Sequence, residues 1–252
     1  MIYNKRMLFK SRYYQPGSDK PFKISRSKID LFVECERCFY LDRRLGIPRP
    51  SMPGFSLNSA VDTLLKNEFD ILRKEKKPHA LMKKYGIEAI PFSHPDLPKW
   101  RGDVNRFSGA AVLHKRTNLI VDGLIDDLWI DKKGEIVIVD YKSTSTEKEI
   151  SLEDKYKQGY KRQVEVYQWI FRQMNFAVSK KAYFVFANAI RNNPRFDGIL
   201  SFKLSIVPYV GDDRWVEDCL DRIKKTLEGD KVPQAGKDCE HCLFTSRQSR
   251  LS

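Results

Sequence analysis

The stretch between Thr117 and Ser143 (TNLIVDGLIDDLWIDKKGEIVIVDYKS) constrains the fold most, because it predicts a β-hairpin. Two runs rich in Ile, Leu and Val, at Leu119–Ile130 and Glu135–Val139, flank the polar, glycine-containing segment Asp131–Gly134. Such a segment is typical of the turn that joins two antiparallel strands. A chain organised around this hairpin is expected to have a β-sheet at its centre.

Charged side chains interrupt the apolar pattern of the hairpin. Asp126 follows Gly123 by three residues on the first strand, and Asp140 and Lys142 end the second strand, so both point to the same side of it. Acids and an amine beside a buried sheet are unfavourable unless they are paired or bind metal. Two carboxylates at adjacent strand ends can hold Mg²⁺ or Mn²⁺, with the Tyr141 backbone carbonyl as a further ligand. The alternative is a surface ion pair.

The rest of the chain alternates helical and strand-like patterns. The periodicity predicts helices over 27–45, 57–76, 152–175 and 213–228, and further strands over 107–114, 181–189 and 199–206. Signals are weak over 76–102, where 91–98 is loop-like. This order predicts an α/β fold with a mixed central sheet flanked by helices.

The charge balance points to a polyanionic partner. The 252 residues include 46 Lys and Arg and 33 Asp and Glu, a net charge of +13. Nucleic acid is the first candidate, an anionic membrane the second, and a merely basic soluble protein the alternative. Residues 1–24 are basic with interleaved aromatics, so they form either an arm that contacts nucleic acid or a frayed terminus. We expect one domain over 25–245, followed by a tail over 246–252.

Location follows from what the sequence lacks. No apolar run approaches the roughly 20 residues that cross a bilayer, and the first residues have no apolar core of a signal peptide. We therefore expect a cytoplasmic protein without a membrane partner.

Two cysteine pairs predict a second metal site. Cys35 and Cys38 lie near one end of the chain, and Cys239 and Cys242 lie near the other. In a reducing compartment, four thiolates suit an iron–sulfur cluster or Zn²⁺, which would clip the two ends together. The alternative is two unrelated pairs. Cys219, on the last predicted helix, is expected to be a core residue.

Several short motifs in one order resemble the PD-(D/E)XK nuclease superfamily. They are a G-x-x-D strand, an apolar strand ending in D-x-K, and a helix with Q-x-x-x-Y. The similarity is greatest to the RecB-like branch, which includes the AddB nuclease domain and CRISPR-adaptation exonucleases. Its first helix also resembles the segment that begins at Ser25 and continues to Cys35 and Cys38. The matched motif residues are Gly123, Asp126, Asp140, Lys142, Gln163 and Tyr167.

This resemblance implies an αβββαβ core and a metal-dependent nuclease that acts on DNA single strands or ends, in repair, recombination or defence. A helicase or another repair or defence protein is then a candidate partner. Asp126 and Asp140 would bind the metal ion and Lys142 would assist the attacking water. Gln163 and Tyr167 would line the site, although plain helix packing is the alternative for that pair.

The sequence departs from the family pattern in two places. Asp62 takes the position of a metal-binding His on the helix before the strands, so it is either a harder ligand or a sign of a weakened site. Several RecB-like nucleases join their termini with a 4Fe-4S cluster held by one early and three late cysteines. The two-plus-two split found here keeps Zn²⁺ open as the alternative. Two other functions also remain, namely a non-catalytic nucleic-acid-binding module and a purely structural zinc or iron–sulfur protein.

Overall fold

The computed structural model describes residues 13–51, 54–104 and 108–249. The chain divides into two compact units. The terminal unit draws on 1–53, 112–122 and 214–252, and the sheet unit draws on 54–111 and 123–213. Residues 1–12 of the predicted arm and 250–252 of the predicted tail lie outside the described residues, and the single domain over 25–245 stays a prediction.

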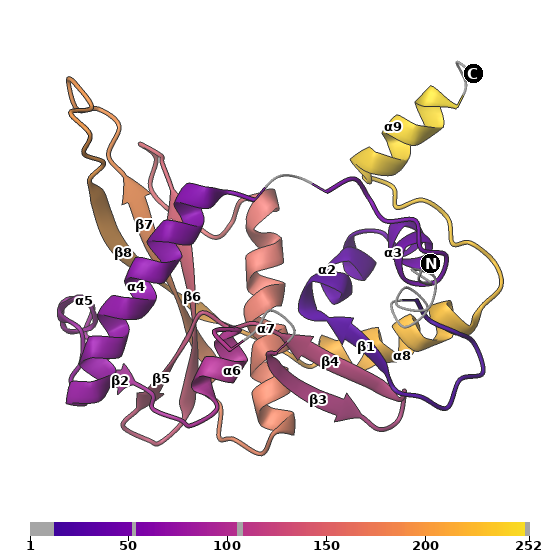
Figure 1. Ribbon diagram of the computed structural model, residues 1–252, viewed down its shortest axis with the longest axis horizontal. Coiled ribbons are helices and arrows are strands. Elements are labelled where there is room, and N and C mark those ends of the chain that lie inside the picture. Colours follow the sequence, from indigo (N-terminus) through magenta and orange to yellow (C-terminus); the bar gives the residue numbers. More distant parts are fainter. Residues whose placement is uncertain (1–12, 52–53, 105–107, 250–252) are drawn as a thin grey trace, which may run out of the picture. The chain divides into compact units, whose positions relative to one another are not determined.

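A mixed five-stranded sheet forms the centre of the sheet unit (Figure 1). Its spatial order is β2-β5-β6-β7-β8, with β6 and β7 parallel and the other neighbours antiparallel. The strands are β2 (Ala89–Pro91), β5 (Asp127–Asp131), β6 (Ile136–Thr144), β7 (Lys181–Ala189) and β8 (Phe202–Val210). This arrangement confirms the predicted mixed α/β fold with helices beside a central sheet.

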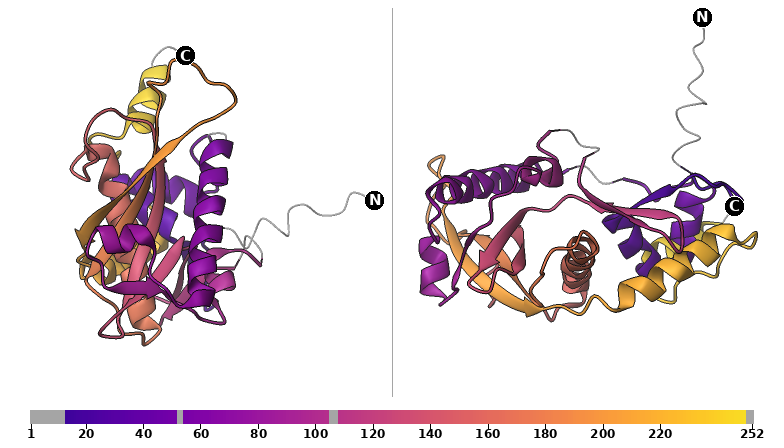
Figure 2. Two further views of the ribbon diagram at one scale, coloured as in Figure 1. Left: turned by 90° about the vertical axis from the view of Figure 1, so that its left-hand side faces the viewer. Right: turned by 90° about the horizontal axis from the view of Figure 1, so that it is seen from below.

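Two long helices cover opposite faces of these strands (Figure 2). Helix α4 (Ser56–Glu75) buries Val61, Leu65 and Phe69, which recur every four residues and share a core cluster with Tyr141 of β6. Side chains alternate across a strand, so Asp140 and Lys142 face the other way, toward α7 (Gln158–Gln173). The two faces of β6 therefore differ beyond Val139, where one face carries Tyr141 and the other carries Asp140 and Lys142.

The predicted hairpin exists, but its first strand is two strands. The turn over Asp131–Gly134 joins antiparallel β5 and β6, as expected. However, β4 (Leu119–Gly123) ends before β5 begins and belongs to a different sheet. The Ile125 N–H donates to the Trp100 carbonyl at 3.1 Å, so at this point the backbone bonds to a short helix (Leu97–Arg101) rather than to a strand. Asp126 therefore lies in a break between strands.

Short elements fill the region whose sequence signals are weak. These are α5 (Ala80–Lys84), β2 and α6 (Leu97–Arg101), and α6 buries Leu97 and Trp100. In chain order the sheet unit contains α4, β2, β5, β6, α7 and β7, which gives the predicted αβββαβ order with β8 added. Its first strand is β2, however, and not the predicted strand over 107–114, of which 107 lies outside the described residues. The strand predicted over 181–189 has the predicted ends, and the elements predicted over 57–76, 152–175, 199–206 and 213–228 occur with shifted ends.

The terminal unit combines a small sheet with helices. β1 (Phe22–Ser25) pairs in parallel with β4, which also neighbours β3 (Ala110–His114). The helices are α2 (Arg26–Glu34), α3 (Glu36–Arg43), α8 (Trp215–Glu228) and α9 (Glu240–Gln248). The sequence predicted neither β1 nor α9.

The helix predicted over 27–45 is broken at Cys35. This residue has an extended backbone (φ −162°, ψ 105°), so it ends α2 and begins α3. Its N–H donates to the Leu31 carbonyl at 2.9 Å, and its carbonyl accepts from the Phe39 N–H at 3.1 Å. Both backbone groups are thus satisfied across the break, so it leaves neither of them unpaired.

Candidate active site

The candidate active site lies where β6 runs past the end of β5. The last pair between these strands joins Asp127 and Val139, whereas β6 continues beside β7 as far as Thr144. The edge of β6 that faces β5 is therefore open beyond Val139. There the Tyr141 N–H donates to Asp126 Oδ2 at 2.8 Å, which fixes the Asp126 carboxylate against the strand.

Asp140 is fully buried at the start of this open edge. Its carboxylate forms an ion pair with Lys142, but neither oxygen has a hydrogen-bond partner among the described residues. Buried carboxylates normally have such partners, because desolvation is otherwise costly. Contrary to the prediction, Asp140 and Lys142 lie inside β6 rather than at its end. A buried carboxylate with an ion pair to Lys142 but no hydrogen bond among the described residues fits a residue that can also bind a cation.

Lys142 connects the strand to α7. Its Nζ donates to Gln163 Oε1 at 3.4 Å and lies 4.6 Å from the centre of the Tyr160 ring. Gln163 Nε2 is 3.3 Å from the Tyr167 hydroxyl, which donates to the Leu124 carbonyl. The structure thus brings both predicted helix residues together with the lysine.

Asp62 approaches the same place from α4. It forms an ion pair with Lys66 at 2.9 Å, and the Lys66 ammonium lies 3.8 Å from Asp126 Oδ1. Asp62 and Asp126 are therefore close, with a lysine between them. The sequence did not single out Lys66, although its spacing of four from Asp62 places both on one side of the helix.

Burial and the neighbouring charges shift the pKa values of the carboxylates and of Lys142 in this site. Burial, and then the charge of Asp140, raise the pKa of Asp126 to about 6. Burial and Asp126 also raise the pKa of Asp62. Burial alone would lower the pKa of Lys142, but Asp140 and Asp126 outweigh it and raise that pKa. The site consequently holds excess negative charge, which favours the binding of a divalent cation.

A buried ion network that the sequence did not predict surrounds Asp127, the first residue of β5. Asp127 is fully buried and accepts bonds from Arg73 Nη2 at 2.5 Å, Arg101 Nη2 at 2.6 Å and the Tyr141 hydroxyl at 2.8 Å. Asp70 binds both arginines as well. Tyr141 therefore contacts Asp126 through its N–H and Asp127 through its hydroxyl. The doubled aspartate in the sequence was the available signal.

The four predicted cysteines meet in the terminal unit. All are buried, and their Sγ atoms lie within 4.8 Å of one another. Three separations are 3.8 Å (Cys35–Cys242), 3.6 Å (Cys38–Cys239) and 3.5 Å (Cys38–Cys242). Within the described ranges, no other group of three or more His, Cys, Asp or Glu residues is as tight. The acids of the candidate active site are thus more widely spaced.

Hydrogen-bond donors surround these thiols. The Gly236 N–H lies 3.3 Å from Cys35 Sγ, and Arg49 Nη2 lies 3.4 Å from Cys239 Sγ. Burial would raise the pKa of Cys35, but donors that include the Cys38 and Gly236 N–H groups lower it to about 7. Such donors favour thiolates, which are the metal-binding form. Cys219 is buried elsewhere on α8 and lies outside the cluster.

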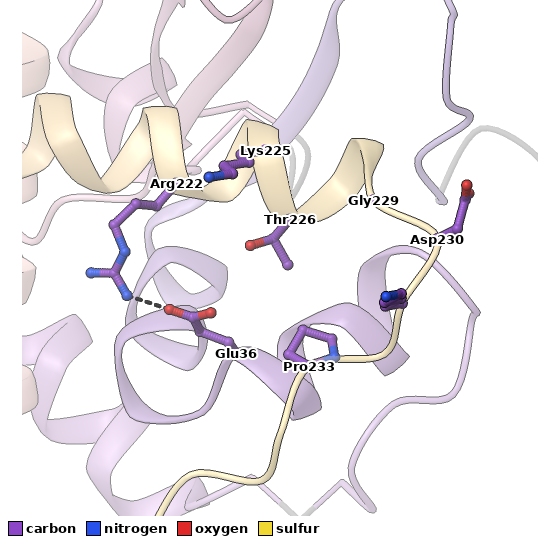
Figure 3. A pocket seen from close by; sticks show the side chains of 8 residues that line it. Glu36, Arg222, Lys225, Thr226, Gly229, Asp230 and Pro233 are labelled. Atoms are coloured by element: carbon purple, nitrogen blue, oxygen red, sulfur yellow. Dashed lines mark hydrogen bonds and ion pairs between the residues drawn. The ribbon is translucent and has the colours of Figure 1, made fainter.

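A separate cavity of about 610 Å³ also lies in the terminal unit (Figure 3). Glu36 and Arg222 form an ion pair in its wall, and Lys225 and Asp230 add charges of both signs. None of the predicted site residues lines this cavity, so the motifs do not point to it.

A comparison with protein-family models agrees with the motifs. The model of the PD-(D/E)XK nuclease superfamily matches residues 70–247. No curated protein matches the sequence. A solved structure, "Crystal structure of SSO0001", is similar at 12% sequence identity and a TM-score of 0.36, over 92% of this chain and 87% of that chain. So weak a likeness carries no conclusion about function.

Among residues 13–51, 54–104 and 108–249, no helix is long and apolar enough to cross a membrane.

Proposed function

This chain belongs to the PD-(D/E)XK nuclease superfamily, and from that premise we propose that it is a metal-dependent nuclease that cleaves DNA single strands or ends. Membership implies a nucleic-acid substrate and a divalent metal ion. The single observation that carries the proposal is the open edge of β6, where the buried Asp140 lies close to the partly exposed Asp126 and Lys142. A role in repair, recombination or defence, in the cytoplasm, belongs to the same proposal.

The residues present fit a hard divalent cation such as Mg²⁺. Asp126 and Asp140 supply carboxylates, and both Asp140 oxygens lack other hydrogen-bond partners among the described residues. In a strand, the N–H and C=O of one residue face the same neighbour, so the Tyr141 carbonyl lies on the Asp126 side of β6. Asp62 is the fourth proposed ligand. When bound, the ion would lower the pKa of a water molecule and stabilise charge on the phosphoryl oxygens.

The surrounding side chains have separate proposed tasks. Lys142 holds a positive charge next to Asp140, where it can orient the attacking water. Gln163 accepts a hydrogen bond from the Lys142 ammonium, and the Tyr167 hydroxyl of α7 donates a hydrogen bond to the Leu124 carbonyl. The net charge of +13 favours binding of the phosphate backbone, with a strong dependence on salt.

Cleavage of labelled substrates tests this function. Purified protein is incubated with end-labelled single-stranded DNA, linear duplex, closed circular DNA and RNA, in Mg²⁺, Mn²⁺ or EDTA. We expect metal-dependent cleavage of single strands or ends, which Lys142→Ala abolishes. Lys133→Ala removes a charge from the exposed Asp131–Gly134 turn and serves as the matched control. Equal cleavage by Lys142→Ala and the control would refute the proposed role of this site in cleavage.

A non-catalytic nucleic-acid-binding module is the second candidate, because Lys66 lies between Asp62 and Asp126. That arrangement offsets part of the charge of two proposed ligands without a metal ion. This candidate predicts salt-sensitive DNA binding, measured by fluorescence anisotropy, with no cleavage under any metal condition. Cleavage that depends on Mg²⁺ would exclude it.

We propose that the four cysteines bind one metal ion, with Zn²⁺ favoured over the 4Fe-4S cluster that the RecB-like resemblance suggests. Tetrahedral Zn²⁺ with Zn–S bonds of about 2.3 Å places its sulfurs about 3.8 Å apart. Three of the six separations, at 3.5 to 3.8 Å, match that value, and none of the six exceeds 4.8 Å. A 4Fe-4S cluster spreads its thiolates further, because each binds a different iron. Arg49 and the Gly236 N–H would offset the thiolate charge.

Metal analysis of anaerobically purified protein tests this centre. One zinc per chain, a colourless solution and loss of zinc in Cys242→Ser are the expected results. Cys219→Ser, at a buried thiol outside the cluster, should keep its zinc. A brown protein with stoichiometric iron would establish the iron–sulfur alternative. Absence of both metals would refute a metal centre.

A further inference from the structure

Lys66 reaches the candidate active site but has no part in the mechanism proposed above. Its ammonium lies 2.9 Å from Asp62 Oδ2 and 3.8 Å from Asp126 Oδ1, and its side chain is 17% exposed. The lysine therefore occupies the space between two carboxylates that are proposed metal ligands. In the absence of a metal ion, this one ammonium forms ion pairs with both carboxylates.

Packing of α4 holds Lys66 in this position. Val61, Leu65 and Phe69 anchor one side of the helix in the core of the sheet unit. Asp62 and Lys66 each follow a core residue by one position, so both lie on the flank of the buried face. The backbone of Lys66 is thus fixed, whereas its four-carbon side chain has rotatable bonds that let the ammonium move.

We propose that Lys66 is a resident counter-cation, which holds Asp62 and Asp126 together without metal and which a divalent ion must displace. This inference rests on the metal site of the proposed function. Three carboxylates (Asp62, Asp126 and Asp140) and two ammoniums (Lys66 and Lys142) give the site a net charge of −1. Without the Lys66 charge the net would be −2, which a divalent ion neutralises. Lys66 therefore lowers the affinity of the site for metal.

Displacement follows from the geometry of the two ion pairs. An ion that binds both Asp62 and Asp126 would occupy the space that the ammonium fills, and two cations repel each other at such distances. The Lys66 amine must then turn toward solvent. Its chemical accessibility should consequently depend on metal, a property that can be measured without any nuclease assay.

Mn²⁺ binding, followed by the electron paramagnetic resonance of the free ion, tests the inference. Lys66→Met should bind Mn²⁺ about ten-fold more tightly than wild type. Lys74→Met removes a lysine from the exposed side of the same helix and should bind as wild type does. Circular dichroism establishes that all three proteins are folded. Equal or weaker binding by Lys66→Met would overturn the counter-cation role.

Labelling of lysine amines gives a second readout in the wild-type protein. We expect little modification of Lys66 in EDTA and several-fold more in Mn²⁺, with Lys74 unchanged, as measured by mass spectrometry. Unchanged labelling of Lys66 would contradict displacement. If wild type and Lys66→Met bind Mn²⁺ equally, only this inference fails. If neither binds Mn²⁺, the metal site of the proposed function fails with it.

Discussion

Adjacent Asp126 and Asp127 are expected to respond in opposite ways to the same substitution. Asp127 is fully buried and accepts bonds from Arg73, Arg101 and the Tyr141 hydroxyl. Asp127→Asn removes the charge that pairs with two buried guanidinium groups. Breaking a buried ion pair in this way costs about 3–5 kcal/mol. We expect the lower end, because both arginines keep Asp70 as a partner.

Asp126→Asn should instead raise the free energy of unfolding. Burial and the charge of Asp140 raise the pKa of Asp126 to about 6, so folding disfavours its charged form at pH 7. Its side chain is 21% exposed, and water screens part of this effect. We therefore expect a gain of about 1–2 kcal/mol. The gain is complete above pH 6 and vanishes as the pH falls toward the unfolded pKa of about 4.

Urea unfolding in buffer free of divalent ions measures both effects. Trp100, Trp129 and Trp169 lie in the sheet unit, so tryptophan fluorescence reports chiefly on that unit. Midpoints at pH 7 and pH 5 give the two free-energy differences. Losses of similar size in both variants, or an Asp127→Asn loss below about 1 kcal/mol, would refute this description of the charges.

Three further predictions concern the support of the site. Burial raises the pKa of Asp70, but its arginine partners outweigh this and lower it, so this carboxylate stabilises the fold above about pH 4. The advantage of wild type over Asp70→Asn in unfolding free energy should shrink as the pH falls below that value, and a constant difference would contradict it. Tyr141→Phe removes one hydrogen bond to Asp127, so it should lower the free energy of unfolding in urea by about 1–2 kcal/mol while cleavage persists. Loss of cleavage in a fully stable variant would contradict this. Gly109 has φ +152°, and an added Cβ would lie 2.8 Å from the Gly123 carbonyl oxygen, so Gly109→Ala should cost about 2–3 kcal/mol by thermal unfolding; an unchanged melting temperature would contradict it.

Local patterns predicted those parts of the fold that local chemistry determines. The segment Asp131–Gly134 forms its turn because Gly134 adopts φ +76° and the Asp131 carboxylate accepts backbone N–H groups. The apolar spacing in α4 likewise indicated a buried face, which Val61, Leu65 and Phe69 form, whereas the neighbouring Leu64 is exposed. Both depend on residues only a few positions apart, which a sequence displays directly.

Long-range contacts determine what the sequence did not reveal. The run Leu119–Ile130 keeps apolar residues on both sides of its acidic ones, so its pattern does not show that the chain leaves one sheet after Gly123 and enters another at Asp127. The break at Cys35 is hidden because Leu31, Cys35 and Cys38 keep a helical spacing. Lys66 belongs to the site through its distance to Asp126, a residue 60 positions away.

The central claim is that the open edge of β6 hydrolyses phosphodiester bonds with a bound divalent metal ion. Single-turnover cleavage of end-labelled single-stranded DNA by Asp140→Asn and wild type, across a titration of Mg²⁺, tests it most directly. Wild type should cleave at a rate that saturates with Mg²⁺ and is zero in EDTA. Asp140→Asn should be slower by at least about 10³-fold, since such a residue acts only through the reacting centre. Wild-type rates in a folded Asp140→Asn protein, or cleavage that persists in EDTA, would contradict the account.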